Sequence, residues 1–264
     1  MGQTEDAERP PIKPLLVEVG VVLLVTFGAS ALTSVLDLAD MSLTAGGVGA
    51  HRVTLNAPAL RVAALDVGRG LVYAAHLAAF AGLAAVLLAK DRRGNGEGGI
   101  LGRLGLSWTG ARQAARDLGS GMCLAALIGV PGLALYLAAH QLGLAPAVAP
   151  AQGYPWWRAP ELVLLAFANG LAEEVVVVGY LITRLRQLGV SSRLALCASA
   201  LLRGCYHLYQ GLPAGAGNVA MGLVFGLVWL RWRRLAPLVA AHALIDSVAF
   251  VGYPLLHGHV SWLP

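Results

Sequence analysis

Charged residues are scarce in this sequence. Only 12% of its 264 residues are Asp, Glu, Lys or Arg, whereas soluble globular domains carry about 25%. With 57% hydrophobic residues and a mean hydropathy of +0.68, the chain could not cover its surface in water. A soluble protein is therefore excluded, and an integral membrane protein is indicated. In such a composition, the net charge of +5 indicates cytoplasmic Lys and Arg anchors rather than nucleic acid binding.

Cysteine is also scarce, and the common metal-binding spacings are missing. The sequence has three cysteines, and their odd number and spacing fit neither a disulfide framework nor a zinc knuckle. It has no His-Glu-x-x-His, the pair of histidines that binds zinc on a metalloprotease helix. Metal binding therefore has to be argued from other residues.

Long apolar runs are what the sequence has instead. A helix needs about 20 apolar residues to cross a bilayer. Seven runs come near this length, so we expect an all-α, polytopic membrane helical bundle with about seven transmembrane helices. The runs are 15–36, 69–89, 118–141, 161–182, 194–210, 217–232 and 235–255. Residues 1–14 are expected to form a polar N-terminal tail, and residues 15–264 the membrane-embedded domain.

The basic residues predict the orientation of this bundle. Lys and Arg precede the first run and crowd the connections between runs two and three, four and five, and six and seven. The alternate connections hold few of them or none. Because cytoplasmic loops are enriched in Lys and Arg, the N-terminus is predicted to be cytoplasmic and the C-terminus to lie outside.

Six ionisable residues interrupt the apolar runs. Such a side chain inside a bilayer costs roughly 2.5–3.5 kcal/mol, so these residues usually face one another or water. Neighbouring helix positions differ by about 100°, so two adjacent carboxylates should have different roles. Counting the helical rise along each run places the group in the inner half of the membrane. The six residues are Glu173, Glu174, Arg203, His207, His242 and Asp246.

The order of these residues resembles a known family. Glu173-Glu174, then His207, then His242-x-x-x-Asp246 resemble the three motifs of the CPBP family, also called the ABI family. These intramembrane endopeptidases include the Ras-converting CAAX protease. The resemblance covers about residues 160–250 and implies a helical membrane protease that cuts near the cytosolic face. In the family, the first Glu and the middle His activate a water, and the last His with its Asn or Asp supports the site or the oxyanion.

The sequence departs from the family pattern at two positions in the first two motifs. The family Arg, four residues after the second Glu, is Val178 here, and the family Phe, four residues before the middle His, is Arg203. We hypothesise that Arg203 pairs with Glu174 across the helix interface and replaces the lost cation. The third motif ends in Asp246, which cannot donate a hydrogen bond when ionised. Asp246 should therefore orient His242, bind a metal or stay protonated.

The residues suggest a mechanism of peptide hydrolysis. Glu173 is expected to act as general base on a water that is also held by His207 or by a metal. His242, with Asp246 behind it, would stabilise the oxyanion, while Glu174 and Arg203 hold the helices in register. A Zn²⁺ ion bound by Glu173, His207, His242 and Asp246 is a further hypothesis, because two histidines and carboxylates suit zinc.

Partners and alternatives complete the expectation. The chain should contact membrane lipid and a peptide, prenylated or membrane-protein substrate, with no nucleic acid, in the plasma membrane of a bacterium. A proton-coupled transporter also places carboxylates and histidines mid-membrane, but it usually shows repeats, and the sequence shows none. A non-catalytic adaptor or bacteriocin-immunity protein on the same fold is the second alternative, because two motif positions are altered.

Overall fold

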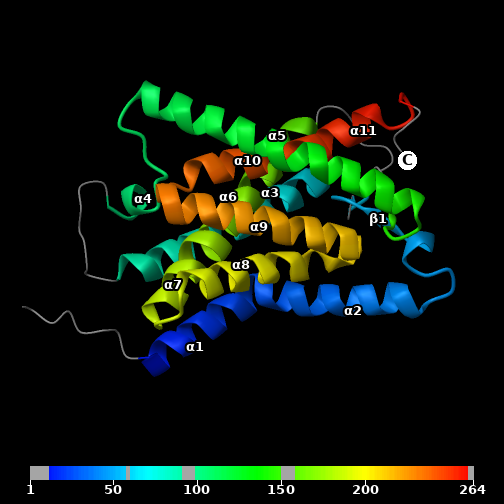
Figure 1. Cartoon of the computed structure of the whole chain (residues 1–264). Coiled ribbons are helices and arrows are strands. Elements are labelled where there is room, and N and C mark those ends of the chain that lie inside the picture. The colour runs from blue at the N-terminus through cyan, green and yellow to red at the C-terminus, as the bar shows by residue number, and fades with distance from the viewer. Residues whose placement is uncertain (1–11, 58–59, 91–98, 150–157, 261–264) are drawn as a thin grey trace, which may run out of the picture.

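The computed structural model describes residues 12–57, 60–90, 99–149 and 158–260. It confirms an all-α membrane bundle, in which the helices run side by side along one axis (Figure 1). Most of the predicted tail, residues 1–14, lies outside the described residues, and the first helix begins at Ile12. The α-helices are α1 Ile12–Leu23, α2 Ala29–Leu43, α3 Ala63–Ala89, α4 Gly99–Arg103, α5 Ala111–Gln141, α6 Ala159–Glu173, α7 Leu181–Gln187, α8 Ser192–Tyr206, α9 Leu212–Trp232, α10 Ala236–Ser247 and α11 Tyr253–Leu256.

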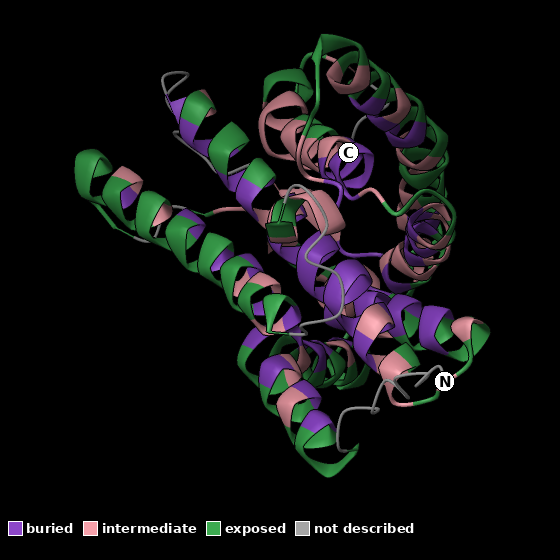
Figure 2. Ribbon diagram, turned by 90° about the vertical axis from the view of Figure 1, so that its left-hand side faces the viewer, coloured by how far each residue is buried: buried purple, intermediate pink, exposed green. Residues whose placement is uncertain are grey.

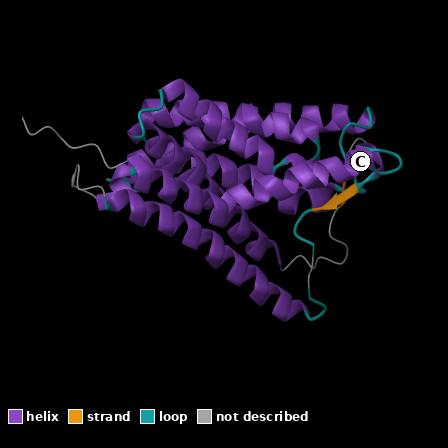
Figure 3. Ribbon diagram, turned by 90° about the horizontal axis from the view of Figure 1, so that it is seen from below, coloured by secondary structure: helices purple, strands orange, loops and turns teal. Residues whose placement is uncertain are grey.

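Three π-helical segments join some of these helices into longer rods. Segment η1 (Leu24–Gly28) links α1 to α2, η4 (Glu174–Tyr180) links α6 to α7, and η6 (Val248–Gly252) links α10 to α11. Short 3₁₀ turns occur at η2 (Val48–Ala50) and η5 (Leu208–Gln210). Strands β1 (Arg52–Thr54) and β2 (Ala147–Ala149) form a small parallel sheet at one end of the bundle (Figure 3).

Within the described residues, six rods are long and apolar enough to cross a membrane, so the prediction of seven was one too many. They are Ile12–Leu43, Ala63–Ala89, Ala111–Gln141, Ala159–Gln187, Leu212–Trp232 and Ala236–Leu256. The predicted run 194–210 becomes α8, whose 15 residues span only about 22 Å at 1.5 Å per residue. The helix ends at Tyr206 because the chain turns through η5 to Gly211, whose φ of +93° suits glycine. Helix α8 still passes along the bundle beside α9 (Figure 1).

The rod formed by α6, η4 and α7 is the innermost element. Of its most apolar window, 72% is buried, and the ribbon is buried on nearly all sides at its centre (Figure 2). Four successive valines, Val175–Val178, are at most 1% exposed. A helix that is apolar all round belongs in the middle of a bundle. Its two carboxylates are therefore enclosed by α3, α8, α9 and α10 rather than by lipid.

Close backbone approach brings α10 onto this rod. A Cβ added to Gly170 of α6 would lie 3.1 Å from the Cβ of His242 and 3.1 Å from the backbone nitrogen of Ala243. A larger residue at position 170 would push α10 away, because both contacts are tighter than ordinary packing. Glycine at this position therefore sets the distance between the motifs on α6 and α10.

Buried arginines pin both ends of the bundle. At the end where α1 begins, Arg184 bonds to Glu18 at 2.8 Å and to the Leu87 carbonyl at 2.7 Å, which ties α7 to α1 and α3. At the opposite end, Arg158 contacts Asp66 at 2.6 Å and Glu161 at 2.9 Å. These bonds compensate the cost of taking the charges out of water.

Candidate active site

Five of the six predicted residues form one connected cluster in the bundle interior. Glu173 and Glu174 come from the central rod, Arg203 from α8, and His242 and Asp246 from α10. Each is buried or half-buried. Ion-pair distances of 2.7–3.9 Å connect all five. The three motifs therefore meet, as the cost of isolated charges in a membrane predicts.

Glu174 is the centre of the fully buried half of this cluster. Its Oε1 accepts hydrogen bonds from Arg203 Nη2 and from His242 Nδ1, both at 2.7 Å. Glu174 and Arg203 are 0% exposed. The hypothesis that Arg203 pairs with Glu174 across the helix interface is therefore confirmed. The guanidinium comes from the facing helix, while Val178 fills the family position with an apolar side chain.

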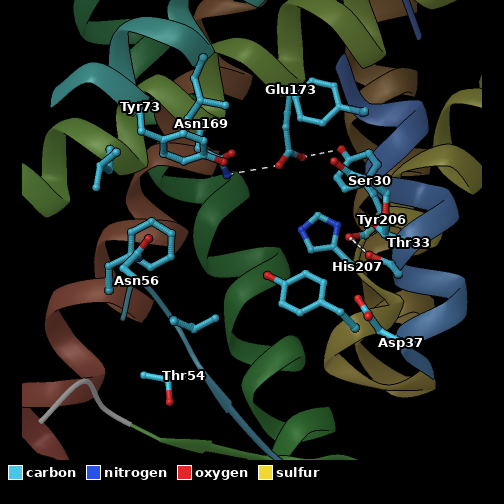
Figure 4. Close-up of a pocket in the computed structure, with 17 residues that line it drawn as sticks. Ser30, Thr33, Asp37, Thr54, Asn56, Tyr73, Asn169, Glu173, Tyr206 and His207 are labelled. Carbon is cyan, nitrogen blue, oxygen red and sulfur yellow. Dashed lines mark hydrogen bonds between the residues drawn. The ribbon is translucent and has the colours of Figure 1, made fainter. Parts of the chain in front are cut away.

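Glu173 faces the other way, toward a cavity. Its Oε2 accepts a hydrogen bond from the Tyr206 hydroxyl at 2.6 Å, and its Oε1 accepts one from the Asn169 amide at 3.2 Å (Figure 4). Arg203 Nη1 lies 3.6 Å from the same Oε2. Both carboxylate oxygens are thus oriented by donors, and the adjacent glutamates have separate surroundings, as the helical rotation between them predicts.

Asp246 is placed differently from the expectation. Its Oδ2 lies 3.7 Å from His242 Nε2, which is too far for a hydrogen bond, and accepts one from Asn169 at 2.8 Å. The residue that bonds directly to the His242 ring is Glu174. Because a carboxylate only accepts, the Nδ1 of His242 carries a proton, and its Nε2 is directed toward Glu173, 3.9 Å away. Glu174 and Asp246 therefore approach opposite nitrogens of one ring.

His207 lies beside the cluster, just past the end of α8. Its Nδ1 is 2.9 Å from the Arg203 carbonyl oxygen, and its ring centre is 4.7 Å from that of Tyr206. A carbonyl can only accept, so Nδ1 carries the proton and Nε2 is the ring's acceptor when His207 is neutral. His207 and Glu173 line the same cavity.

This cavity has a volume of about 420 Å³ and reaches Glu173 from the side (Figure 4). Helix α2, with Ser30 and Asp37, forms one wall, and Tyr73 and Asn56 lie across from it. The predicted position in the inner half of the membrane is wrong. Glu173 is 14 residues from each end of the rod 159–187 (173 − 159 and 187 − 173), hence roughly 21 Å from both. The site is therefore at mid-depth.

Comparison with known proteins agrees with the motifs. Residues 155–248 match the family model described as type II CAAX prenyl endopeptidase, Rce1-like. The membrane core of this chain belongs to the CAAX protease family. None of the curated proteins matches the chain, and none of the solved structures does.

The matched segment of this CAAX protease family member contains the whole cluster. It runs from just before α6 to the end of α10, and the cavity wall from α2 and α3 lies outside it. The family core thus supplies the charged residues. The N-terminal third of the chain supplies most of the hydroxyl groups around the cavity.

The four residues predicted as zinc ligands do not fit a metal in this arrangement. Across the residues that the structure describes, no three His, Cys, Asp or Glu side chains are grouped closely enough to hold an ion. The Arg203 guanidinium already contacts both glutamates. A cation next to the carboxylates therefore comes from the chain itself, and no chemical step below is routed through a metal.

Two functional residues were not predicted as part of the site. Tyr206 holds Glu173, and Asn169 bridges Glu173 and Asp246. A sequence signal was available for Asn169, which precedes Glu173 by four residues and so shares its helix face. Tyr206 gave none of this kind, because its hydroxyl meets Glu173 only through the crossing of α8 and the central rod.

Proposed function

We propose that the protein is an intramembrane endopeptidase that hydrolyses a peptide bond in a membrane-associated or prenylated substrate. The observation that carries the proposal is Glu173, a buried carboxylate with two hydrogen-bond donors and an edge on the cavity. The match to a family of prenyl endopeptidases supports the reaction class. A carboxylate held in this way can accept a proton from a water molecule without first reorganising.

In the proposed reaction, Glu173 removes a proton from water, and the water oxygen attacks the scissile carbonyl carbon. The carbonyl oxygen becomes an oxyanion. When the tetrahedral intermediate collapses, the C–N bond breaks, and Glu173 returns the proton to the departing amine. The sum is one water consumed and two peptide ends formed.

The oxyanion needs donors near Glu173, and the chain offers two. Arg203 Nη1 and His242 Nε2 lie 3.6 and 3.9 Å from Glu173 Oε2, on the interior side of the carboxylate. His242 can donate from Nε2 only as an imidazolium, and Glu174 at its Nδ1 favours that form. Removing one such donor costs about 10²–10³ in kcat in other hydrolases.

His207 is proposed to orient the attacking water. Its Nδ1 is held by a backbone carbonyl, which leaves Nε2 as an acceptor on the cavity. An acceptor there can take the second proton of the water in a hydrogen bond while Glu173 takes the first. His207 is thus a positioning partner for the base rather than a second base.

The decisive experiment compares Glu173→Gln with the unmodified protein in detergent, on a panel of prenylated and transmembrane peptides. Glutamine keeps the size of the side chain but cannot accept the proton, so we expect cleavage to disappear while the thermal unfolding temperature changes by only a few degrees. Asp40→Asn is the matched control, because Asp40 is an exposed carboxylate of α2 that does not line the cavity. Cleavage that survives Glu173→Gln would overturn the proposal.

A further inference from the structure

Helix α2 carries a polar stripe that the proposed reaction does not use. Ser30, Thr33, Ser34 and Asp37 follow one another at helical spacings of three, one and three residues, so they share one face. The opposite face carries Leu32, Val35 and Leu36, which are 45–69% exposed. A stripe of this kind is costly against lipid. All four polar residues line the cavity that leads to Glu173.

The charge of this cavity has one sign. Its lining, as far as the structure describes it, includes the carboxylates of Asp37 and Glu173 but no lysine or arginine. Asp37 is exposed, and the described residues offer it no ion pair. The remaining polar groups are hydroxyls, amides and one imidazole. Carboxylates on low-dielectric walls attract cations, because the surrounding apolar helices focus their field.

The cavity opens at one identifiable end of the molecule. Its wall includes Thr54, Leu55 and Asn56, which lie in and after β1, in the connection between α2 and α3. Thr54 and Asp37 are both exposed there. The basic residues gather at the opposite end, where α1 begins and α7 ends: Lys13, Lys90, Arg103, Arg112, Arg186, Arg193 and Arg231. By the distribution of basic residues, the open end faces away from the cytoplasm.

We propose that Glu173 is reached from the outer, non-cytoplasmic face through a cation-selective entrance, in which Asp37 receives a positively charged side chain of the peptide substrate. The inference rests on the proposed function for the word substrate, but the entrance and its selectivity belong to the fold. Asp37 lies two helical turns from Ser30, roughly 10 Å along α2. A Lys or Arg a few residues from the scissile bond, on the outer side, would therefore place its charge at Asp37 while the bond lies at Glu173.

The first test measures from which side the cavity is accessible, and it needs no proteolysis. The full-length protein, with its three cysteines replaced by serine, receives one new cysteine at a time. Thr33→Cys lies on the cavity wall, Leu36→Cys on the lipid face of the same helix, and Arg193→Cys at the basic end. A membrane-impermeant methanethiosulfonate reagent is added to right-side-out or to inside-out vesicles.

We expect position 33 to react only in right-side-out vesicles and position 193 only in inside-out vesicles. Position 36 should react slowly in both, because lipid covers it. Reaction at position 33 only from the cytoplasmic side would overturn the proposed entrance. Reaction at position 36 as fast as at position 33 would also overturn it, because the stripe would then not mark an aqueous path.

The second test measures charge selectivity at the same cysteine. A cationic trimethylammonium reagent and an anionic sulfonate reagent of the same length are compared at Thr33→Cys. The cation should react at least about tenfold faster, relative to the ratio of the two reagents with a free thiol, because the carboxylates concentrate it. Adding Asp37→Asn should bring the ratio most of the way back, whereas Asp40→Asn should leave it unchanged. Equal rates with Asp37 intact would overturn the selectivity.

These tests are separate from the test of catalysis. If labelling shows an outward, cation-selective path but Glu173→Gln does not affect cleavage, the proposed function fails and the entrance stands. If cleavage requires Glu173 but labelling comes from the cytoplasmic side, the entrance fails and the endopeptidase stands.

Discussion

Arg203 Nη2 lies 2.7 Å from Glu174 Oε1, with both side chains fully enclosed by the bundle. The family pattern places its arginine on the same helix as the glutamate, whereas here the cation crosses from α8. The pair therefore does what a helical i, i+4 pair cannot do: it fixes two helices to each other. The same carboxylate oxygen also binds His242, so one glutamate joins three helices.

Removing this cation should destabilise the protein strongly. Arg203→Met leaves a buried carboxylate without its partner, and breaking a buried pair in this way costs about 3–5 kcal/mol. We expect a large drop in the thermal unfolding temperature of detergent-solubilised protein. Combining Arg203→Met with Glu174→Gln should recover part of the loss, because no uncompensated charge then remains. A double variant that is less stable than either single one would contradict the pairing.

The family arrangement can also be rebuilt in this chain. Val178→Arg with Arg203→Phe restores both family residues, and the new arginine stands four positions after Glu174 on the same rod. We expect this double variant to unfold at a higher temperature than Arg203→Phe alone. Val178→Arg alone should be destabilised, because it adds a second guanidinium to a position that is 0% exposed. The rescue is measured against that single variant as its control.

Tyr206→Phe should lower turnover without unfolding the protein. The change removes the 2.6 Å hydrogen bond to Glu173 and keeps the ring, which packs against Phe27 with ring centres 5.0 Å apart. A hydrogen bond to a charged group is worth about 1.5–3 kcal/mol, which corresponds to a fall in kcat of about tenfold to a hundredfold. Tyr209→Phe is the control, since Tyr209 lines the same cavity but bonds to Gln210. A purely structural tyrosine would change stability and leave kcat intact.

Asp246→Asn should be tolerated. The amide oxygen of the new asparagine can still accept the hydrogen bond from Asn169, and asparagine is one of the two residues that the family pattern allows at this position. We expect initial rates within about tenfold of the unmodified protein. Asp246→Leu, which cannot accept that bond, should lose nearly all activity. If the asparagine and leucine variants are equally inactive, the negative charge at position 246 is required.

Gly70→Ala tests the ion cluster at the outer end. A Cβ at this position would lie 1.9 Å from Glu161 Oε1, an atom that Arg158 holds by a 3.1 Å hydrogen bond. Relief of the clash requires the ion pair to move, at a cost of about 1–3 kcal/mol. Gly68→Ala, two residues earlier on α3, meets no atom within 4 Å and should be neutral or stabilising. Equal unfolding temperatures for the two variants would show that the clash is absorbed without cost.

The part of the fold and the site that followed from the sequence is the part governed by strong, local rules. Apolar runs predicted the helical rods, and the cost of charges in lipid predicted that Glu174 and Arg203 would find each other. The family match of residues 155–248 agrees with motifs that could be read directly. These inferences needed no knowledge of how the helices cross.

The part that could not be predicted depends on tertiary geometry. The run 194–210 looked like one span because its residues are apolar, but the chain breaks at His207 and Gly211, which places His207 at a helix end. The exchange of partners around His242, with Glu174 on Nδ1 and Asp246 farther away, depends on the orientation of the ring between two helices. The outward cavity likewise required the position of α2 relative to the central rod.

The π-helical segment Glu174–Tyr180 has a consequence for how this protein can vary. A π turn holds more residues than an α turn, so the wide segment sets the rotation between the two halves of its rod. Losing one residue from it would allow an ordinary α-helix but would turn one half by about 100°. Either Glu174 would leave Arg203, or Arg184 would leave Glu18. Point substitutions can therefore accumulate along this rod, whereas single-residue deletions between its two anchored ends should be absent from functional relatives.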